Sequence, residues 1–519
     1  MKLGDLVSAL TVNVPITGTW SQREVTAVVQ DSRRAAPGSL FVAVRGFHSD
    51  GHRFIPQAVG QGAVAVVAEE SASVEVVPDI PVIRVPDSRK ALARLAAKFY
   101  DYPSRRIKLV GITGTKGKTT TSYLMRSIIE AAGHQAGLIG TIDYRIGDRV
   151  YPAPNTTPES LDLQALFAEM AERGARYCVL EVSSHALALG RTDECEFEAA
   201  AFTNLAHEHL DFHRTMDEYG AAKALLFSSL ASDKAAVVNM DDAFGSAIIK
   251  RTAARVITYG ITGHADVRPA GNIGHNISGL SLAVSTPSGE INIESSLVGR
   301  HNIYSILAAV GLGIALGFSG EAVATGIKQM KAVPGRMEKV VAGQTFGVLV
   351  DYAHTEGSLR SLLEAVREMT GKRVITVFGC GGDRDRAKRP KMGAAAIAHS
   401  DLVIVTSDNP RTEDSLAIIG EIEAGMTAGI RMEKLEPLCC GPRARSVSNK
   451  TPYAVIPDRA DAIETAVRLA GPGDVVVLAG KGHEDYQIVG ESKHHFDDRE
   501  EARKAIAKLS AECGVRNAE

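Results

Sequence analysis

A glycine-rich loop at residues 114–120, with the sequence GTKGKTT, narrows the choice of fold more than any other feature of this chain. The loop directly follows an apolar run at 107–112 and leads into a helical pattern over about 119–132. Glycines allow close backbone approach, and a helix N-terminus that carries a lysine and a threonine suits phosphate and magnesium. We therefore predict a strand, a phosphate-binding loop and a helix.

The loop is a variant of the usual pattern. The GxxxxGK[ST] spacing is not met, because Ile112 occupies the first glycine position and Gly111 lies one residue early. A plain glycine turn between strand and helix is the alternative interpretation. The adjoining apolar strand and the run of threonines after Lys118 favour phosphate binding.

Apolar runs alternate with helical patterns along the rest of the chain, which is typical of parallel sheets with helices on both faces. In the middle of the chain, further strands are expected at 177–181, 199–202, 235–239 and 255–259. After Pro334-Gly335 the pattern repeats at 346–350, 373–378, 401–405 and 474–478. A chain of 519 residues is too long for one ordinary core. We predict an α/β fold with three domains: an N-terminal domain at 1–104, a central doubly wound P-loop ATP-binding domain at 105–334, and a Rossmann-like C-terminal domain at 335–519.

The composition excludes several classes of partner. The formal net charge of −3 offers no basic excess for nucleic acid or an anionic membrane. The six cysteines form no CxxC zinc pattern and are too sparse for a disulfide scaffold. Neither a signal peptide nor a long apolar segment is evident. We expect a cytoplasmic protein, monomeric and not inserted in a membrane, that acts on small molecules.

Three polar residues of the central region are candidates for chemistry. Glu181 ends an apolar run, and His209 lies in the sequence AHEHLDFH, so that both could approach magnesium near the phosphates. A helix cap or ion pair is the alternative for Glu181, and a hydrogen-bonded turn for His209. Lys223 lies on a helical pattern, where the residues alone favour a lysine whose stem covers apolar surface.

Four predicted strands of the last region end in polar or glycine-rich segments. These segments read DYAHTEG, GCGGDRDR, SDNPRTED and AGKGHED. Ligands of open α/β sheets bind beyond the carboxyl ends of the strands. We therefore predict a second functional crevice where these four segments converge.

Taken in order, the motifs resemble those of the Mur ligases. They are GTKGKTT, NTTPE (155–159), EVSSHAL (181–187), FTNL (202–205), EHLDFH (208–213), YGAAKALLF (219–227), GRHN (299–302), PGRME (334–338), DYAH (351–354), GGDRD (381–385), DNPR (408–411) and GKGHE (480–484). The resemblance covers the chain except the region after about residue 425. It implies domains for a UDP-sugar, for ATP and for an amino acid, and an ATP-dependent amide ligase that works through an acyl phosphate.

The resemblance also implies roles for residues around ATP. The catalytic set would be Lys118, Glu181, His209 and Lys223. The ATP-binding set would be Gly114, Thr115, Lys116, Gly117, Lys118, Thr119, Thr120, Asn302, Arg336 and Asp351. Mg²⁺ would be held by Thr119, Glu181, His209 and Lys223, the last as a carbamate, because the family's matching lysine is modified to N6-carboxylysine.

For the UDP-muramoyl substrate, the resemblance implies a third set of residues. The matching positions are Ser32, Phe47, His48, Ser49, Asn155, Thr156, Thr157, Ser183 and Arg191. Two neighbouring positions depart from the family pattern, since Leu189 stands where a glutamine is frequent and Gln30 where a leucine is frequent.

The last crevice would select the incoming amino acid. The matching residues are Arg384, Asp408, Asn409, Pro410, Arg411, Gly480 and Glu484. The two arginines suit a carboxylate, while Asp408, Asn409 and Glu484 can hold an ammonium group. The DNPR form favours meso-diaminopimelate over lysine or ornithine, and a strand-end turn without ligand contact is the alternative. More remote alternatives are a P-loop kinase, a GTPase switch and a nucleotide-gated binding protein.

Overall fold

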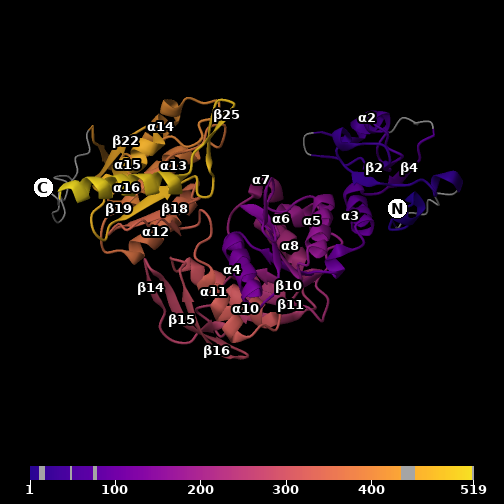
Figure 1. The fold of residues 1–519 in the computed structure, drawn as a ribbon, viewed down its shortest axis with the longest axis horizontal. Helices are drawn as coiled ribbons and strands as arrows, with labels where there is room; N and C mark the ends of the chain where they lie inside the picture. The colour runs from indigo at the N-terminus through magenta and orange to yellow at the C-terminus, as the bar shows by residue number, and fades with distance from the viewer. Residues whose placement is uncertain (11–17, 47–48, 74–78, 434–449, 517–519) are drawn as a thin grey trace. The chain divides into compact units, whose positions relative to one another are not determined.

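The computed structural model describes residues 1–10, 18–46, 49–73, 79–433 and 450–516 (Figure 1). Phe47, His48 and most of the 425–450 segment lie outside these ranges. The chain divides into two compact units. The first comprises Met1–Ala270, Val284–Ile291 and Tyr304–Ile327, and the second Gly271–Ala283, Asn292–Ile303 and Lys328–Glu519. The three-domain boundaries at 104 and 334 stay a prediction.

A small parallel sheet comes first in the chain. Its order is β1-β2-β3-β4, with β1 at Ala27–Val29, β2 at Ser39–Val42, β3 at Ala65–Glu69 and β4 at Val82–Val85. The short helices are α1 (Leu3–Val7) and α2 (Ile55–Gly60). Helix α3 (Ser88–Phe99) begins where the Asp87 side chain accepts the amides of Arg89 and Lys90. Leu92 and Leu95 of this helix pack on the sheet, which joins helix and strands in one core.

The first unit also contains an eight-stranded sheet of order β12-β11-β10-β5-β9-β6-β7-β8. Its parallel strands are β5 (Lys108–Thr113), β6 (Ala136–Ile139), β9 (Tyr177–Glu181), β10 (Phe197–Phe202), β11 (Ala235–Asn239) and β12 (Arg255–Tyr259). The edge strands β7 (Asp143–Ile146) and β8 (Arg149–Pro152) are antiparallel. The four middle-region strands expected from the apolar runs are thereby confirmed.

Helices cover both faces of this sheet, as a doubly wound fold requires. Side chains of α5 (Ser160–Glu172), α8 (Met216–Ser228) and α9 (Gly245–Ile249) share one core with the strands. Helices α4 (Lys118–Ala131) and α10 (His301–Ala315) cover the other face, where the close approach of Gly311 to Val237 holds α10 against β11. The remaining helices are α6 (Ser184–Ala188), α7 (Leu210–His213) and α11 (Gly320–Gln329). A separate antiparallel sheet follows from β13 (Arg268–Pro269), β14 (Gly274–Asn276), β15 (Gly279–Thr286) and β16 (Gly289–Ser295).

The second unit is built on a seven-stranded sheet of order β17-β18-β23-β19-β20-β22-β21. The strands are β17 (Glu338–Lys339), β18 (Gly347–Asp351), β19 (Val374–Phe378), β20 (Leu402–Val405), β21 (Gly429–Arg431), β22 (Thr451–Val455) and β23 (Val475–Ala479). Only the β17–β18 pair is antiparallel among the described pairs. The prediction of a second α/β sheet is confirmed. A hairpin, β24 (Tyr486–Val489) and β25 (Ser492–His495), follows β23.

Local sequence explains why the helices of the second unit form where they do. Thr355 caps α12 (Glu356–Met369) in a capping box with Ser358. Leu359, Leu362 and Val366 then recur at helical spacing and pack on one face of the sheet with α13 (Lys388–His399) and α14 (Ser415–Glu423). The other face carries α15 (Arg459–Leu469) and α16 (Asp498–Arg516).

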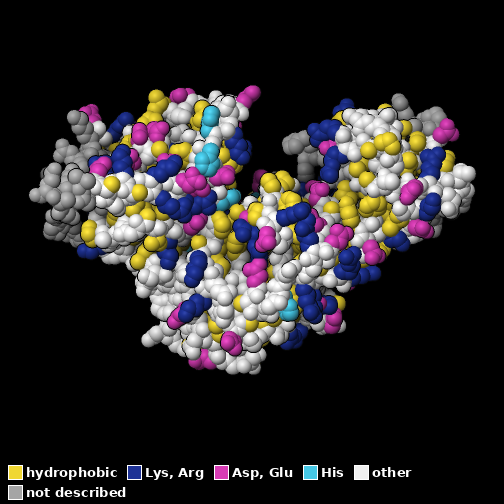
Figure 2. Space-filling model, viewed as in Figure 1, with side chains coloured by type: hydrophobic (Ala, Val, Ile, Leu, Met, Phe, Trp, Pro, Cys, Tyr) yellow, Lys and Arg dark blue, Asp and Glu magenta, His cyan; other side chains and the backbone are white. Residues whose placement is uncertain are grey.

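On the surface shown in Figure 2, basic and acidic side chains are mixed, and neither positive nor negative side chains form a large patch. Within the described part of the chain, no helix has both the length and the apolar character needed to cross a bilayer.

A fully buried ion pair joins α15 to α16. Arg459 and Asp498 are both inaccessible to solvent, and the Arg459 guanidinium binds the carboxylate at 2.6 and 2.7 Å. The same guanidinium donates to the carbonyl of Ala479 at the end of β23. Removing one partner of such a pair leaves an uncompensated charge buried in the core.

We predict that Asp498→Asn lowers the free energy of opening of β23 by about 3–5 kcal/mol, because Arg459 then lacks its counter-charge. Hydrogen exchange of peptides that span β23 and α16 measures this opening. The control is Glu501→Gln, whose partner Lys504 is exposed, and it should change little. An equal response of the two variants would contradict the prediction.

Candidate functional site

The glycine loop lies between the end of β5 at Thr113 and the start of α4 at Lys118. Gly114 has φ of 150° and Gly117 has φ of 86°, values that side-chain residues rarely adopt. A Cβ atom on Gly114 would lie 1.8 Å from the Thr203 hydroxyl. Glycine is therefore required where the loop passes the next strand.

A second loop, at 203–204, holds the glycine loop in place. The Thr115 amide donates to the Asn204 carbonyl at 2.8 Å, and the Lys116 amide donates to the Asn204 side chain at 2.9 Å. The first intrahelical bond of α4 runs from the Thr121 amide to the Gly117 carbonyl. The amides of residues 118–120 thus lie in the first turn, where a helix binds anions.

The Lys118 side chain folds back over this loop. Its Nζ atom donates to the carbonyls of Gly114 and Thr115 at 2.8 and 3.0 Å. A cation and the first-turn amides of α4 therefore come from one short segment, which suits a polyphosphate.

Glu181 is a fully buried carboxylate at the end of β9. It accepts from the Thr119 hydroxyl at 2.9 Å and from the Thr141 hydroxyl at 3.0 Å. The Thr141 amide donates to the other carboxylate oxygen at 3.1 Å. Gly140 makes this approach possible, since a Cβ there would lie 2.3 Å from the carboxylate. The predicted proximity of Thr119 and Glu181 is therefore present in the structure.

Thr141 is a residue that the sequence analysis missed. It follows β6 by two positions and so lies at the same edge of the sheet as the glycine loop. The rule that strand ends converge in a parallel sheet points to Thr141 only once the end of β6 is recognised. Strand β6 has only four residues, which makes its end harder to recognise than the others.

Lys223 is 1% exposed and lies on α8. Its Nζ atom lies 4.3 Å from the centre of the Tyr219 ring, and the Tyr219 hydroxyl lies 3.1 Å from that of Thr115. Burial and, to a smaller extent, the charge of Lys118 lower the pKa of Lys223 to about 6, against the opposing charge of Glu208. The ammonium form is thus disfavoured beside the phosphate loop, so the interpretation of a lysine that reaches water is wrong.

His209 lies at the start of α7 with φ of 58°. Burial lowers the pKa of its ring, and the charge of Lys118 acts in the same direction, whereas Glu208 opposes them. The ring of His185 stands 5.0 Å away, and burial lowers the pKa of His185 to about 4. These imidazoles are therefore kept neutral, as metal binding requires.

Among the described residues, no cluster of three His, Cys, Asp or Glu side chains could hold a metal ion. The Thr119 hydroxyl and the Glu181 carboxylate are nevertheless adjacent oxygen donors of the kind that magnesium prefers. Mg²⁺ usually takes only one or two protein carboxylates together with phosphate oxygens. The donor set therefore fits a magnesium ion bound with a nucleotide.

Most residues predicted for the UDP-muramoyl substrate come together around Glu181. The Thr157 hydroxyl donates to the Glu181 carbonyl at 2.8 Å and accepts from the Ser183 amide at 3.0 Å. Arg191 donates to the Thr157 carbonyl at 2.9 Å, and the Thr156 hydroxyl lies 3.1 Å from that of Thr141. Asn155 directly precedes Thr156 in the same loop.

The other residues predicted for this substrate lie in the first part of the chain. The Ser32 hydroxyl donates to Gln57 at 2.9 Å, while Ser49 lies in the loop after β2. Phe47 and His48 fall outside the described residues.

Asn302, Arg336 and Asp351, predicted for the nucleotide, lie in the second unit. The Met337 amide donates to the Asp351 carboxylate at 2.8 Å, which brings the PGRME and DYAH motifs together. The Arg336 guanidinium lies 5.3 Å from the centre of the Tyr352 ring. Their approach to the glycine loop stays a prediction.

Two loops at the carboxyl edge of the second sheet are tied to each other. The Gly382 amide donates to the Asn409 carbonyl at 2.9 Å, and Arg411 donates to the Gly382 carbonyl at 2.7 Å. Thr412 and Asp383 are linked through their side chains at 2.7 Å. The predicted convergence of GGDRD and DNPR is therefore confirmed.

The GKGHE segment completes this edge. Lys481 is fully buried and binds the side chains of Asp408 and Asn409 at 3.4 and 3.1 Å. The Asn409 amide donates to Glu484 at 2.8 Å. Arg384 is exposed, Pro410 is buried, and Gly480 has φ of 117° beside Asp408. Sequence reasoning missed Lys481, because a lysine between two glycines suggests a solvated turn.

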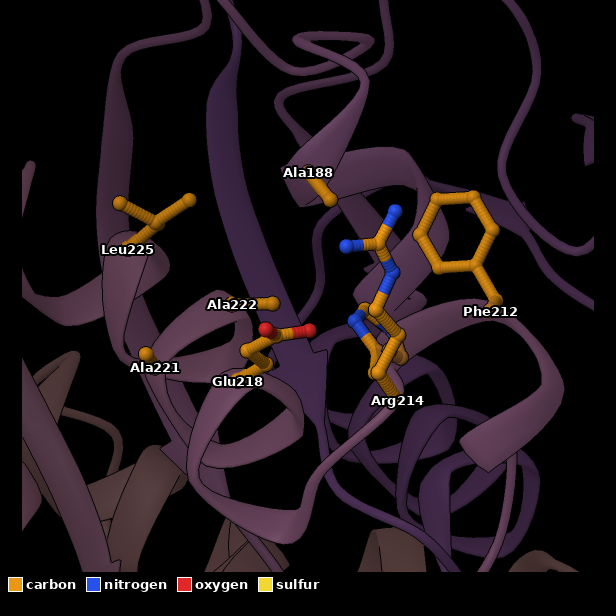
Figure 3. A pocket seen from close by; sticks show the side chains of 8 residues that line it. Ala188, Phe212, Arg214, Glu218, Ala221, Ala222 and Leu225 are labelled. Atoms are coloured by element: carbon orange, nitrogen blue, oxygen red, sulfur yellow. The ribbon is translucent and has the colours of Figure 1, made fainter.

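A pocket of about 450 Å³ lies beside α6, α7 and α8. Figure 3 shows the charged ends of Arg214 and Glu218 pointing into it. Its α8 residues are Glu218, Ala221, Ala222 and Leu225. Of these, Glu218, Ala221 and Leu225 lie on the helix face opposite Lys223 by helical spacing. The Lys223 side chain is accordingly not among those that line the pocket.

Comparison with known proteins agrees with this arrangement. Three family domains match: the Mur ligase family catalytic domain at 24–100, the Mur ligase middle domain at 112–313, and the Mur ligase glutamate ligase domain at 335–482. The UDP-N-acetylmuramoyl-L-alanyl-D-glutamate--2,6-diaminopimelate ligases of Geobacter metallireducens and Geobacillus thermodenitrificans are 47% and 46% identical to this chain. Each match covers 98% of this chain and 99% of the relative.

Solved structures show the same fold. A structure named as a UDP-N-acetylmuramoyl-L-alanyl-D-glutamate--2,6-diaminopimelate ligase is 30% identical, with a TM-score of 0.71 over 98% of this chain and 100% of the other. The MurF ligase of Thermotoga maritima, solved in complex with ADP, is 17% identical, with a TM-score of 0.59 over 94% and 98% of the two chains. Motifs, fold and relatives agree, and the chain belongs to the Mur ligase family.

Proposed function

We propose that this protein is an ATP-dependent, ADP-forming amide ligase that adds meso-2,6-diaminopimelate to UDP-N-acetylmuramoyl-L-alanyl-D-glutamate in peptidoglycan precursor synthesis. The observation that carries the proposal is the full-length similarity to ligases of that name, at 42–47% identity. A glycine loop with a buried Glu181–Thr119 pair supports ATP binding. The tied DNPR and GGDRD loops support an amino-acid site.

The reaction would join two substrates through an activated carboxylate. The γ-phosphoryl group of ATP passes to the D-glutamate carboxylate and forms an acyl phosphate and ADP. The acceptor's amine then attacks the acyl carbon, phosphate leaves, and an amide remains. Lys118 and the first-turn amides of α4 would stabilise the charge on the transferred phosphoryl group.

Magnesium would be held by Thr119, Glu181, His209 and the carbamate of Lys223. When bound, the ion supplies positive charge beside the phosphate oxygens. Glu181 offers a carboxylate that two threonines already orient. The neutral ring of His209 is the form that could serve as a ligand.

The carbamate on Lys223 rests on the state of its amine. Carbon dioxide reacts with a neutral amine, forms an N–C bond and releases a proton. Because burial lowers the pKa of Lys223 to about 6, most of the amine is neutral at pH 7. The product is an anionic oxygen donor beside the cation Lys118, which would stabilise it.

The remaining assignments follow the same order along the chain. Residues 1–104 would bind the UDP moiety with Ser32 and Ser49, and residues 105–334 would bind ATP. The cluster of Asn155, Thr157 and Arg191 would guide the muramoyl dipeptide toward Glu181. Residues 335–519 would bind the acceptor, and the protein would act as a monomer in the cytoplasm.

The activity is tested by phosphate release from ATP in the presence of the UDP-muramoyl dipeptide. We expect release to depend on an added amino acid, with meso-diaminopimelate giving the highest kcat/KM among diaminopimelate, L-lysine and L-ornithine. A kinase or a switch would hydrolyse ATP regardless of the amino acid. Preference for lysine would overturn the acceptor assignment alone.

We predict that Lys223→Ala removes most activity, and that short carboxylates partly restore it by replacing the carbamate oxygens. Wild-type activity should fall as pH decreases through about 6, because protonation of the amine removes the form that reacts with carbon dioxide. The control is Lys250→Ala, an exposed lysine of the same unit. Absence of any rescue, together with an unmodified amine in electron density, would refute the carbamate.

We predict that Arg411→Ala weakens use of diaminopimelate by about 1.5–3 kcal/mol, since a charged hydrogen bond to its distal carboxylate is lost. Use of lysine, which lacks that carboxylate, should change much less. The measurement is kcat/KM for both acceptors, with Arg431→Ala as the control because its partner Glu423 lies away from this edge. Equal losses for the two acceptors would indicate that Arg411 only holds the loop at Gly382.

A further inference from the structure

We propose that Lys481 is a positioning residue of the acceptor site: its buried ammonium orients Asn409 and keeps Glu484 ionised, so that Glu484 can bind the ammonium group of the acceptor. The proposal deepens the function proposed above and rests on it. Three of the residues predicted to contact the acceptor, Asp408, Asn409 and Glu484, surround this one side chain.

The burial of Lys481 requires partners. Its side chain is inaccessible to solvent, and its Nζ atom lies 3.1 Å from the Asn409 amide oxygen. Carboxylate oxygens of Asp408 and Glu484 lie 3.4 and 3.8 Å away. A buried ammonium is costly unless it is paired and hydrogen-bonded, so these four side chains form one electrostatic unit.

The orientation of Asn409 follows from Lys481. The Asn409 amide oxygen accepts from Lys481 and also from the Ile488 amide at 3.0 Å. Both of its lone pairs are therefore used. The Asn409 amide nitrogen must point the other way, where it donates to Glu484 at 2.8 Å. An acceptor ammonium would accordingly meet the carboxylates of Glu484 and Asp408, while Asn409 acts through Glu484.

The charge of Lys481 opposes the tendency of Glu484 to take up a proton. Burial raises the pKa of Glu484 and the charge of Asp408 raises it further, whereas the Asn409 hydrogen bond, Lys481 and Arg411 lower it. Arg459, Tyr352 and Tyr486 also face this carboxyl group. Without Lys481, two carboxylates would share a smaller positive charge, and Glu484 would protonate at a higher pH.

A purely structural role for Lys481 is less consistent with its surroundings. The end of β23 is already fixed by Arg459, which donates to the Ala479 carbonyl and pairs with Asp498. The hairpin after it is held by Gln487, which donates to the Asp408 carbonyl at 2.7 Å. Lys481 adds a charge at the one place where the predicted ammonium-binding residues meet.

The test compares Lys481→Met and Lys481→Gln with Lys504→Met, an exposed lysine on α16. We expect both Lys481 variants to raise KM for diaminopimelate by about tenfold or more, a loss on the scale of one charged hydrogen bond. KM for ATP and for the UDP-muramoyl dipeptide should stay within about twofold. The residues proposed to bind those two substrates are not part of the charge cluster around Lys481. The acid limb of kcat/KM for the acceptor should move to higher pH.

A double-mutant cycle with Glu484→Gln tests whether Lys481 acts on the acceptor through Glu484. If Lys481 acts through Glu484, Lys481→Met should raise KM for diaminopimelate much less in the Glu484→Gln background than in the wild type. Equal costs in both backgrounds, similar rises in all three KM values, or a variant that neither folds nor binds ATP would overturn the proposal. Wild type without any acceptor-dependent phosphate release would instead refute the proposed function.

Discussion

The phosphate site depends on the hydrogen bonds that the buried carboxylate of Glu181 accepts. This carboxylate lies at the end of β9, next to β5 in the sheet, and it binds the hydroxyl of Thr119 in the first turn of α4. Thr141, after the neighbouring strand β6, binds the same group. One carboxylate therefore links three consecutive strand ends and fixes where a cation would meet the phosphates. Parallel pairing makes this possible, because it brings all three ends to one edge.

Much of this arrangement could be predicted from sequence, for a physical reason. Buried parallel strands are continuous apolar runs, so the ends of β5, β9, β19 and β20 are visible as the points where such runs stop. The motifs GTKGKTT, GGDRD and DNPR all begin at those points. The loops that carry chemistry could thus be located without any knowledge of side-chain contacts.

The contacts within the loops could not be predicted in the same way. Thr141 follows a strand of four residues, and nothing in its neighbourhood distinguishes it from an ordinary turn. Lys481 was missed because lysine is rarely buried, and only the tertiary fold brings Asp408 and Glu484 to it. The fold class was confirmed, whereas the boundaries of the three domains remain predictions beside the two compact units that are observed.

Two buried lysines illustrate how surroundings assign different roles to one residue type. Lys481 and Lys223 are both almost completely hidden from solvent, with exposed fractions of 0% and 1%. Lys481 has two carboxylates and an amide oxygen within 4 Å, which stabilise a positive charge. Burial, and then the charge of Lys118, lower the pKa of Lys223 to about 6. Partners that stabilise charge suit an ammonium that organises carboxylates, whereas partners that oppose it suit a neutral amine that can react.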